Sequence, residues 1–252
     1  MDLIIKRLVF VTIFLSTLTS QAYANSLLIW PIYPKISSES NATSIWMVNQ
    51  GTEDFYLQVR IFQWGQKDGQ DTYAQQRQLI ATPPFVKIAP GAKQLIRILN
   101  QDGALSNKEY AYRIIIDELP PAKGPQDENK ENDLAVKVRM RYSIPLFMYG
   151  KGMKRPSQGT NEVWSGLQAK IIKSKDKNLI HIENTSNHYV RLVNLAVTAP
   201  NQSPFIVSKG LAGYILPEQY KTWPISYSNM KNIKVKADIE GKRYVIPLEQ
   251  NE

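Results

Sequence analysis

The sequence contains 252 residues, of which 43% are hydrophobic and 21% are charged, a balance typical of a chain that folds around a core. It contains no cysteine, which excludes disulfide bonds, thiol nucleophiles and cysteine-ligated metal sites. The formal net charge is +9, and this charge favours nucleic acid, an anionic membrane surface or an acidic partner.

The first 24 residues have the pattern of a secretory signal peptide. Positive charge at Lys6 and Arg7 precedes a mostly apolar run, and Ala-Tyr-Ala at 22–24 fits the small-x-small site that a signal peptidase cleaves. We therefore place the mature start at Asn25. The alternative is an uncleaved membrane anchor, but the apolar run is shorter than the roughly 20 residues that a span needs, and no later segment is suitable. Export argues against nucleic acid as a partner.

After the signal peptide, short runs rich in β-branched and aromatic residues alternate with clusters of Gly, Pro, Asn and Asp, which is the pattern of strands and turns. In the first half these runs are 44–49, 55–64, 94–99 and 110–119. No long segment repeats apolar residues at the helical period. The sequence therefore predicts an all-β fold.

A charged segment and a glycine-containing segment interrupt the strands. Residues 120–133 combine proline, glycine and mixed charge without any aromatic residue, which predicts a surface loop. A strand over 134–147 follows, and 150–156 has the composition of a domain linker. A second series of strands is expected at 168–173, 178–184, 189–198, 204–207, 214–217, 222–227, 233–239 and 244–248.

This spacing of strands and turns indicates two β-sandwiches. We assign 1–24 to the signal peptide, 25–150 to an N-terminal domain and 151–252 to a C-terminal domain.

The sequence offers no catalytic constellation. It has neither the G-x-S-x-G string of a hydrolase elbow nor a glycine-rich phosphate loop. His181, His188 and Glu183 could be drawn as a metal site, but His181 falls in a strand and His188 in a turn, so a surface residue and a turn residue are expected instead. Asp117 and Glu118 are adjacent in a strand and point to opposite faces, so they cannot share one reacting centre without a bulge.

The strand that begins at residue 134 has a regular alternation. Its apolar side chains share one face, and they are Leu134, Val136, Val138 and Met140. Its basic side chains share the other face, and they are Lys137, Arg139 and Arg141. Periodicity alone favours an ordinary half-buried strand with a solvated basic face.

The context of this strand resembles a known family, the periplasmic chaperones of the chaperone-usher pathway of pilus assembly. The resemblance covers most of the mature chain and lies in the order and spacing of the segments 48–51, 58–64, 83–85, 88–91, 94–98 and 118–121. The segment 141–147, Arg-Tyr-Ser-Ile-Pro-Leu-Phe, is similar to the archaic branch of that family, which includes Csu-type and spore-coat-U-type systems.

The resemblance implies a boomerang of two immunoglobulin-like domains without enzymatic activity or cofactor. Such a chaperone works in the periplasm, lends a strand to an incomplete pilin subunit and delivers it to an outer-membrane usher, with no stable membrane insertion. It assigns the donor role to Leu134, Val136, Val138 and Met140. Their charged neighbours and the loop before them would keep this edge from pairing with copies of itself.

The family's carboxylate anchor is not carried over to this sequence. Better-known members hold the pilin's terminal carboxylate with an arginine and a lysine, and the corresponding positions here are Tyr33 and Ser143. The alternative cations, beginning with the first candidate, are Arg141, Arg139, Arg113, Arg97 and Lys35. For each of them an ordinary solvated side chain is an equal alternative. Glu118 matches a family glutamate near the hinge, which predicts an interdomain ion pair.

Two other function classes compete with the chaperone. One is a secreted adhesin or carbohydrate-binding module, whose sugar platform would come from Trp30, Trp46, Trp64, Trp164 and Trp223. These tryptophans are instead expected in the core, because most of them fall in predicted strands. The other is a hydrolase that uses His181 or His188, and no partner pattern supports it.

Overall fold

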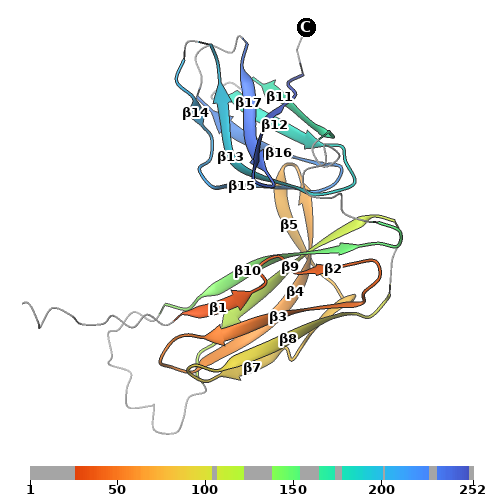
Figure 1. Cartoon of the computed structure of the whole chain (residues 1–252), viewed down its shortest axis with the longest axis vertical. Helices are drawn as coiled ribbons and strands as arrows, with labels where there is room; N and C mark the ends of the chain where they lie inside the picture. The colour runs from red at the N-terminus through yellow and green to blue at the C-terminus, as the bar shows by residue number, and fades with distance from the viewer. Residues whose placement is uncertain are drawn as a thin grey trace, which may run out of the picture.

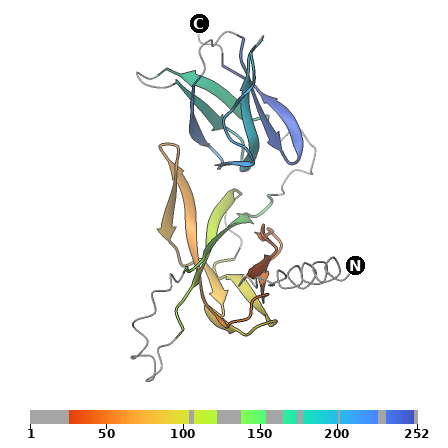
Figure 2. The ribbon, with the colours of Figure 1, turned by 90° about the vertical axis from the view of Figure 1, so that its left-hand side faces the viewer.

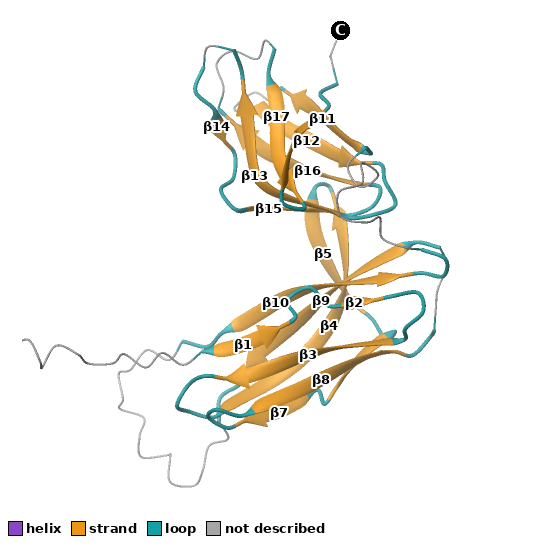
Figure 3. Ribbon diagram, viewed as in Figure 1, coloured by secondary structure: helices purple, strands orange, loops and turns teal. Residues whose placement is uncertain are grey.

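The computed structural model describes residues 26–103, 107–121, 138–153, 165–173, 178–200, 202–226 and 232–249. It contains two stacked β-sandwiches, and no helix occurs among these residues (Figures 1 and 3). The predicted all-β fold is therefore confirmed. The expected signal peptide, Leu134, Val136 and Trp164 lie outside the described residues. In the described part of the chain, no helix has the length and apolar character needed to cross a membrane.

The first sandwich pairs a four-stranded sheet with a six-stranded sheet. The four-stranded sheet has the order β1 (Leu27–Trp30), β3 (Ala42–Asn49), β8 (Lys93–Asn100) and β6 (Leu79–Thr82). The six-stranded sheet has the order β2 (Lys35–Ile36), β10 (Arg141–Tyr149), β9 (Glu109–Glu118), β4 (Phe55–Lys67) and β5 (Gln70–Gln75), and β7 (Phe85–Ile88) also pairs with β4.

Alternation along the strands builds the core of this sandwich. In β4 the side chains of Phe55, Leu57 and Val59 are buried, and those between them are not, as the period of two predicts. The two sheets bring their inward residues into one cluster whose best-buried members include Ile45, Met47, Ile96, Ile98, Ile114, Ile116 and Leu146. Such burial is the main favourable contribution to folding of the domain.

The second sandwich has a three-stranded sheet and a five-stranded sheet. The smaller sheet has the order β11 (Leu167–Ile172), β12 (Asn178–Asn184) and β16 (Gln219–Ile225). The larger sheet has the order β14 (Phe205–Ile206), β13 (Val190–Thr198), β17 (Lys234–Ile239) and β18 (Lys242–Ile246), and β15 (Leu211–Ile215) also pairs with β13. The two sheets enclose a separate core that includes Ile180, Ile182, Leu192 and Val235.

A third buried cluster joins the two sandwiches. Its members are Trp64, Ala111, Phe147, Tyr149, Met153, Tyr189, Tyr214 and Leu216. The Phe147 ring stacks on the Tyr189 ring of the second domain, with their centroids 3.5 Å apart. The centre of the interface is therefore aromatic and buried.

The hairpin of β4 and β5 extends beyond the first sandwich and reaches the second (Figure 2). Near its tip, Gln66 donates from Nε2 to the Tyr214 carbonyl at 2.8 Å and accepts at Oε1 from the Leu216 N–H at 3.0 Å. Lys221 of the second domain lies 3.1 Å from the Asp71 carboxylate. One glutamine thus satisfies two main-chain groups of the neighbouring domain.

A second carboxylate, that of Glu109, also crosses the interface, and the expected position of Glu118 at the hinge needs correcting. Glu109 accepts at Oε1 from the Tyr189 N–H at 2.8 Å, and its Oε2 lies 3.3 Å from His188 Nδ1. Glu118 lies at the opposite end of β9 and interacts with Met140 of its own domain. The predicted strand over 110–119 includes Glu118 but not Glu109, whereas β9 contains both, and only the tertiary contact decides which end meets the second domain.

The two histidines also differ from expectation in one respect. His181 is buried rather than at the surface, and its ring stacks on Tyr220 with centroids 4.4 Å apart. His188 lies in a bend beside Glu109, as the turn prediction places it. Among the described residues, no group of three potential ligands could hold a metal ion.

Candidate functional site

Strand β10 has a free side in the described structure. It pairs with β9 along its whole length, from Arg141 to Tyr149. On its other side, β2 pairs only with Phe147 and Met148. No other described strand covers β10 from Arg141 to Leu146, so its outward N–H and C=O groups can accept another strand.

Two of the predicted donor residues lie just before this edge and are exposed. Val138 is 74% exposed and Met140 is 49% exposed. They continue the alternation of Tyr142 and Ile144, which pack against the core of the first sandwich. The apolar row therefore runs from the sealed core toward solvent along one face.

A glutamate marks the point where the chain's own sheet ends. The Glu118 N–H donates to the Met140 carbonyl at 3.0 Å, and its side-chain Oε2 accepts from the Met140 N–H at 3.0 Å. The residues that follow β9 include Pro120 and Pro121, which have no N–H to extend the ladder. Val138 and Arg139, the described residues just before Met140, are therefore not paired with β9.

An ion cluster fixes the register of β10 beside this point. The Asp117 carboxylate accepts from Arg60 Nη2 at 2.6 Å and also from Arg141 Nε. Burial disfavours ionisation of Asp117, but hydrogen bonds and charges from Arg141 and Arg60 outweigh it and lower the pKa of this carboxyl. Arg141 was the first candidate for the anchor, and its Nε is already committed to Asp117.

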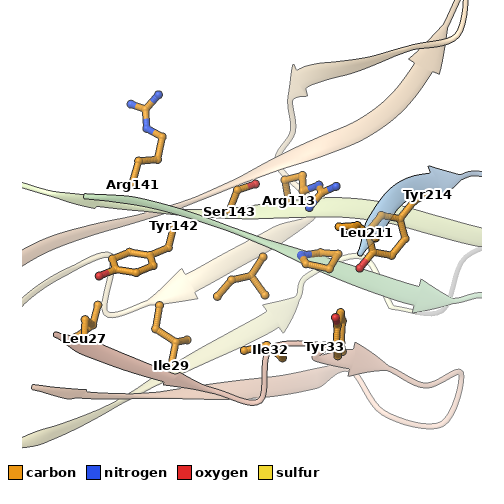
Figure 4. Close-up of a pocket in the computed structure, with 12 residues that line it drawn as sticks. Leu27, Ile29, Ile32, Tyr33, Arg113, Arg141, Tyr142, Ser143, Leu211 and Tyr214 are labelled. Atoms are coloured by element: carbon orange, nitrogen blue, oxygen red, sulfur yellow. The ribbon is translucent and has the colours of Figure 1, made fainter. Parts of the chain in front are cut away.

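A groove of about 500 Å³ runs between β1 and β10 toward the second domain (Figure 4). Its apolar wall includes Leu27, Ile29, Tyr142, Ile144, Pro145 and Leu211. On the outer side of β1 and in the loop after it, Leu28, Trp30 and Ile32 are exposed. The core prediction for Trp30 is therefore wrong, because β1 is an edge strand whose alternate side chains face solvent.

Arg113 lies where this groove meets the second domain. Its guanidinium carbon is 3.8 Å from the Trp64 ring centroid and 5.5 Å from that of Tyr214. Its Nε is buried without a hydrogen-bond partner, and no described carboxylate pairs with it. Arg113 is half-buried and its side chain hydrogen-bonds Tyr73, and its buried Nε without a partner is suited to bind an anion.

The remaining candidate cations are dispersed. Arg139 is exposed and lies with Arg60 and Asp117 around a separate open hollow. Arg97 is exposed on β8 of the other sheet, and Lys35 is exposed on β2. Of the predicted set, the structure brings only Arg113 and Arg141 to the groove.

The described tryptophans do not form a single platform. Trp30 and Trp46 are register partners on neighbouring strands, Trp64 is buried between the domains, and Trp223 packs against the core of the second domain. This distribution gives the adhesin interpretation no support.

Sequence reasoning missed the residues that the second domain contributes to the site. Tyr214 and Leu211 of β15 line the groove with residues of β1 and β10. No motif connects these segments, and the only signal was the aromatic content of 214–217.

The fold and the site define a class: a two-sandwich protein with an uncovered edge strand and an arginine in the cleft between its domains. The family model described as "Pili and flagellar-assembly chaperone, PapD N-terminal domain" matches residues 33–154. Chaperone protein PapD of Escherichia coli is 28% identical over 121 residues, which cover 46% of this chain and 45% of PapD. The chain thus aligns with about half the length of this curated relative.

Similar solved structures cover nearly the whole chain. The crystal structure of the CsuC–CsuE chaperone–tip subunit pre-assembly complex, from the archaic chaperone-usher Csu pili of Acinetobacter baumannii, has a chain with 30% identity and a TM-score of 0.68, and the match covers 89% of this chain and 100% of that one. The YadV chaperone has 16% identity and a TM-score of 0.64, with 87% of this chain and 99% of that one covered. This protein belongs to the PapD-like pilus-assembly chaperones, in the archaic branch.

Proposed function

We propose that this protein is a periplasmic chaperone that binds incomplete pilin subunits by donor-strand complementation and delivers them to an outer-membrane usher. The observation that carries the proposal is the uncovered edge of β10, preceded by the exposed side chains of Val138 and Met140. An incomplete pilin would add its own strand to this edge and receive the apolar row in its open core.

The two exposed donor residues contribute part of the binding energy. Full burial of a valine or methionine side chain is worth about 1.5–3 kcal/mol. Because Val138 is 74% exposed and Met140 is 49% exposed, covering both contributes about 2–4 kcal/mol before ordering costs. Main-chain hydrogen bonds along 141–146 add affinity that does not depend on the pilin's sequence.

Other parts of the proposal rest on the sequence. Leu134 and Val136 extend the donor row by the same alternation. The signal peptide at 1–24 directs the chain to the periplasm, and 25–150 and 151–252 are the pilin-binding and C-terminal domains. A protein that acts by strand addition needs neither a cofactor nor a catalytic residue.

Arg113 is the proposed anchor for a carboxylate of the subunit. It is half-buried in the groove and its buried Nε has no hydrogen-bond partner, whereas Arg141 is held by Asp117. A guanidinium binds a carboxylate through charge-assisted hydrogen bonds, and the interdomain cleft shields them from water.

Replacement of Val138 with aspartate tests the proposal. The matched control is Val245→Asp, because Val245 is 55% exposed on β18 of the second domain. Each variant is co-expressed with a pilin encoded beside the chaperone gene, and soluble pilin is quantified. Val138→Asp should reduce pilin to the level seen without chaperone, because a carboxylate buried without a partner is strongly unfavourable.

Val245→Asp should leave pilin recovery unchanged. Circular dichroism and urea unfolding establish that both variants are folded. Normal pilin recovery by a folded Val138→Asp variant would reject the donor role.

A further inference from the structure

The outer face of the four-stranded sheet is apolar and basic. This outer face consists of the side chains of β1, β3, β8 and β6 that alternate with the buried ones. An antiparallel sheet that packs one face on a core normally presents polar side chains on the other. Here the outward residues of β1 are Leu28 and Trp30. The outward positions of the other three strands carry two charged residues, Lys93 and Arg97, and both are basic.

The strand register arranges the apolar residues in rows across the outer face. Strands β1, β3 and β8 lie side by side along the first sandwich (Figure 1). Trp30 of β1 is the register partner of Trp46 of β3, which in turn faces Leu95 of β8. Nearer the end of the sheet, Leu99 of β8 is the register partner of Ile80 of β6. Because directly opposite side chains on one face are close neighbours, each row is a continuous apolar strip.

These strips are open to solvent. Trp30 is 66% exposed, Leu28 is 47% exposed and Ile80 is 37% exposed. The strand residues that the first domain contributes to the interdomain cluster come from β4, β9 and β10 of the other sheet, and the uncovered edge of β10 belongs to that sheet too. Neither the second domain nor a strand added to β10 therefore occupies the outer face. Contiguous exposed apolar surface of this kind marks an interaction site.

The charges on the outer face favour an anionic partner. Lys93 Nζ lies 5.3 Å from the Trp46 ring centroid, and Arg97 is exposed on β8 between the two apolar rows. Within the described ranges of the chain, neither residue forms an ion pair. Two copies of this face brought together would oppose like charges. An anionic surface would instead neutralise them, and the net charge of +9 adds long-range attraction to it.

We propose that the outer face binds the surface of an anionic lipid bilayer, on which the protein lies without spanning it. Tryptophan is enriched at the membrane–water interface, because its ring is apolar and its N–H is polar. Lysine and arginine beside it keep their charges among the lipid headgroups while their stems cover apolar surface.

A bilayer fits this face better than an acidic protein segment does. A protein partner needs carboxylates placed opposite Lys93 and Arg97, whereas a bilayer offers negative charge and apolar carbon over its whole area. The inference does not depend on donor-strand complementation. Together with the proposed function, it would confine the search for a membrane-embedded usher to two dimensions.

Co-sedimentation with large unilamellar vesicles measures the interaction. One set of vesicles contains phosphatidylcholine alone, and the other contains phosphatidylcholine and phosphatidylglycerol in equal parts. The protein is purified after export, and mass spectrometry establishes that every variant has the same N-terminus. Differences between variants therefore do not arise from residues 1–24.

The wild-type protein should bind the anionic vesicles at least about twenty-five-fold more tightly than the neutral ones, since each cation near an anionic surface contributes about fivefold. Added salt should weaken this binding by screening the charges. The double variant Lys93→Glu/Arg97→Glu should lose at least about twenty-five-fold on anionic vesicles. The matched control Lys234→Glu/Lys242→Glu makes the same change of net charge at exposed lysines of the second domain, and it should lose less than about fivefold.

The apolar contribution is tested at Trp30. Trp30→Ala should weaken binding to anionic vesicles about tenfold, because its exposed ring no longer enters the interface. The control Phe85→Ala removes an aromatic ring that is 59% exposed on β7 of the other sheet, and it should leave binding unchanged. Circular dichroism establishes that the variants are folded. If Trp30→Ala does not fold, the charge variants still test the proposal.

Equal binding of the wild-type protein to both kinds of vesicle, or binding to neither, would overturn the proposal. Equal losses in the two double variants would also overturn it, because attraction would then come from net charge and not from the outer face. An acidic peptide of alternating Glu and Leu is tested in parallel. If Lys93 and Arg97 were needed to bind this peptide and no vesicle were bound, the face would belong to a protein partner and the membrane assignment would be wrong.

Discussion

Gln66 provides a direct test of how the two domains are held together. Its side chain is buried and bonded to the Tyr214 carbonyl and the Leu216 N–H of the second domain. Gln66→Leu keeps a similar volume but removes both partners. Because Tyr214 and Leu216 are themselves buried, their main-chain groups would lose hydrogen bonds and stay unsatisfied unless the interface opens to water.

The cost of this substitution can be worked out from these contacts. Each buried main-chain group left unsatisfied costs about 1–3 kcal/mol, which gives about 2–6 kcal/mol for the pair. The interface can open and admit water, so we expect the lower end, about 2 kcal/mol. The loss should fall on the coupling between domains, because neither separate core includes Gln66.

Urea unfolding followed by tryptophan fluorescence measures this loss, since Trp64 lies in the interface. Gln63→Leu is the matched control, because Gln63 is an exposed glutamine on the same strand. Small-angle X-ray scattering should also report a wider range of domain angles for Gln66→Leu. A free energy of unfolding within about 0.5 kcal/mol of the wild type, together with unchanged scattering, would refute the argument.

Two further predictions concern the ends of β10. Asp117→Asn should destabilise the first domain by about 1 kcal/mol, because its ion pairs are partly exposed. In the wild type, the Asp117 carboxylate stabilises the folded state fully at pH values above its unfolded pKa. This stabilisation is lost as the pH falls through the lowered pKa of the folded state. The protection factors for hydrogen exchange at 140–142, which correct for the pH dependence of intrinsic exchange, should therefore fall at acidic pH in the wild type but change little with pH in the variant, and equal pH dependence would contradict this. Phe147→Ala should lower the free energy of unfolding by about 3–5 kcal/mol. The control Phe85→Ala, at an exposed phenylalanine, should lower it by less than about 0.5 kcal/mol. Equal losses for the two variants in urea unfolding would show that the stack on Tyr189 contributes nothing.

The strands that sequence reasoning located best are those that bury one face. The alternation of Phe55, Leu57 and Val59 predicted β4, and the boundaries expected for β12 agree with the structure. These segments are recognisable because a half-buried strand must alternate. The same alternation placed Val138 and Met140 on one face of their strand. The sequence alone could not decide whether that face is buried in the chain's own core or exposed.

Strand β5 was missed for a physical reason. Its sequence, Gln-Asp-Thr-Tyr-Ala-Gln, is polar, and neither face is buried. It is held by pairing with β4 rather than by a core, so no hydrophobic period marks it. The sequence could not rank the anchor candidates for a similar reason, because Arg113 and Arg141 look alike in sequence and differ in whether a carboxylate lies opposite them.

The double contact between Glu118 and Met140 has a consequence for how this edge can vary. It fixes the residue at which pairing within the chain stops. Upstream of Met140, residues separated from it by an even number of positions face the bound pilin, and those separated by an odd number face solvent. Adding a single residue just upstream of Met140 would present the arginine side of the strand to the bound pilin, whereas adding two would restore the original presentation. Changes of length in this segment are therefore tolerated in pairs.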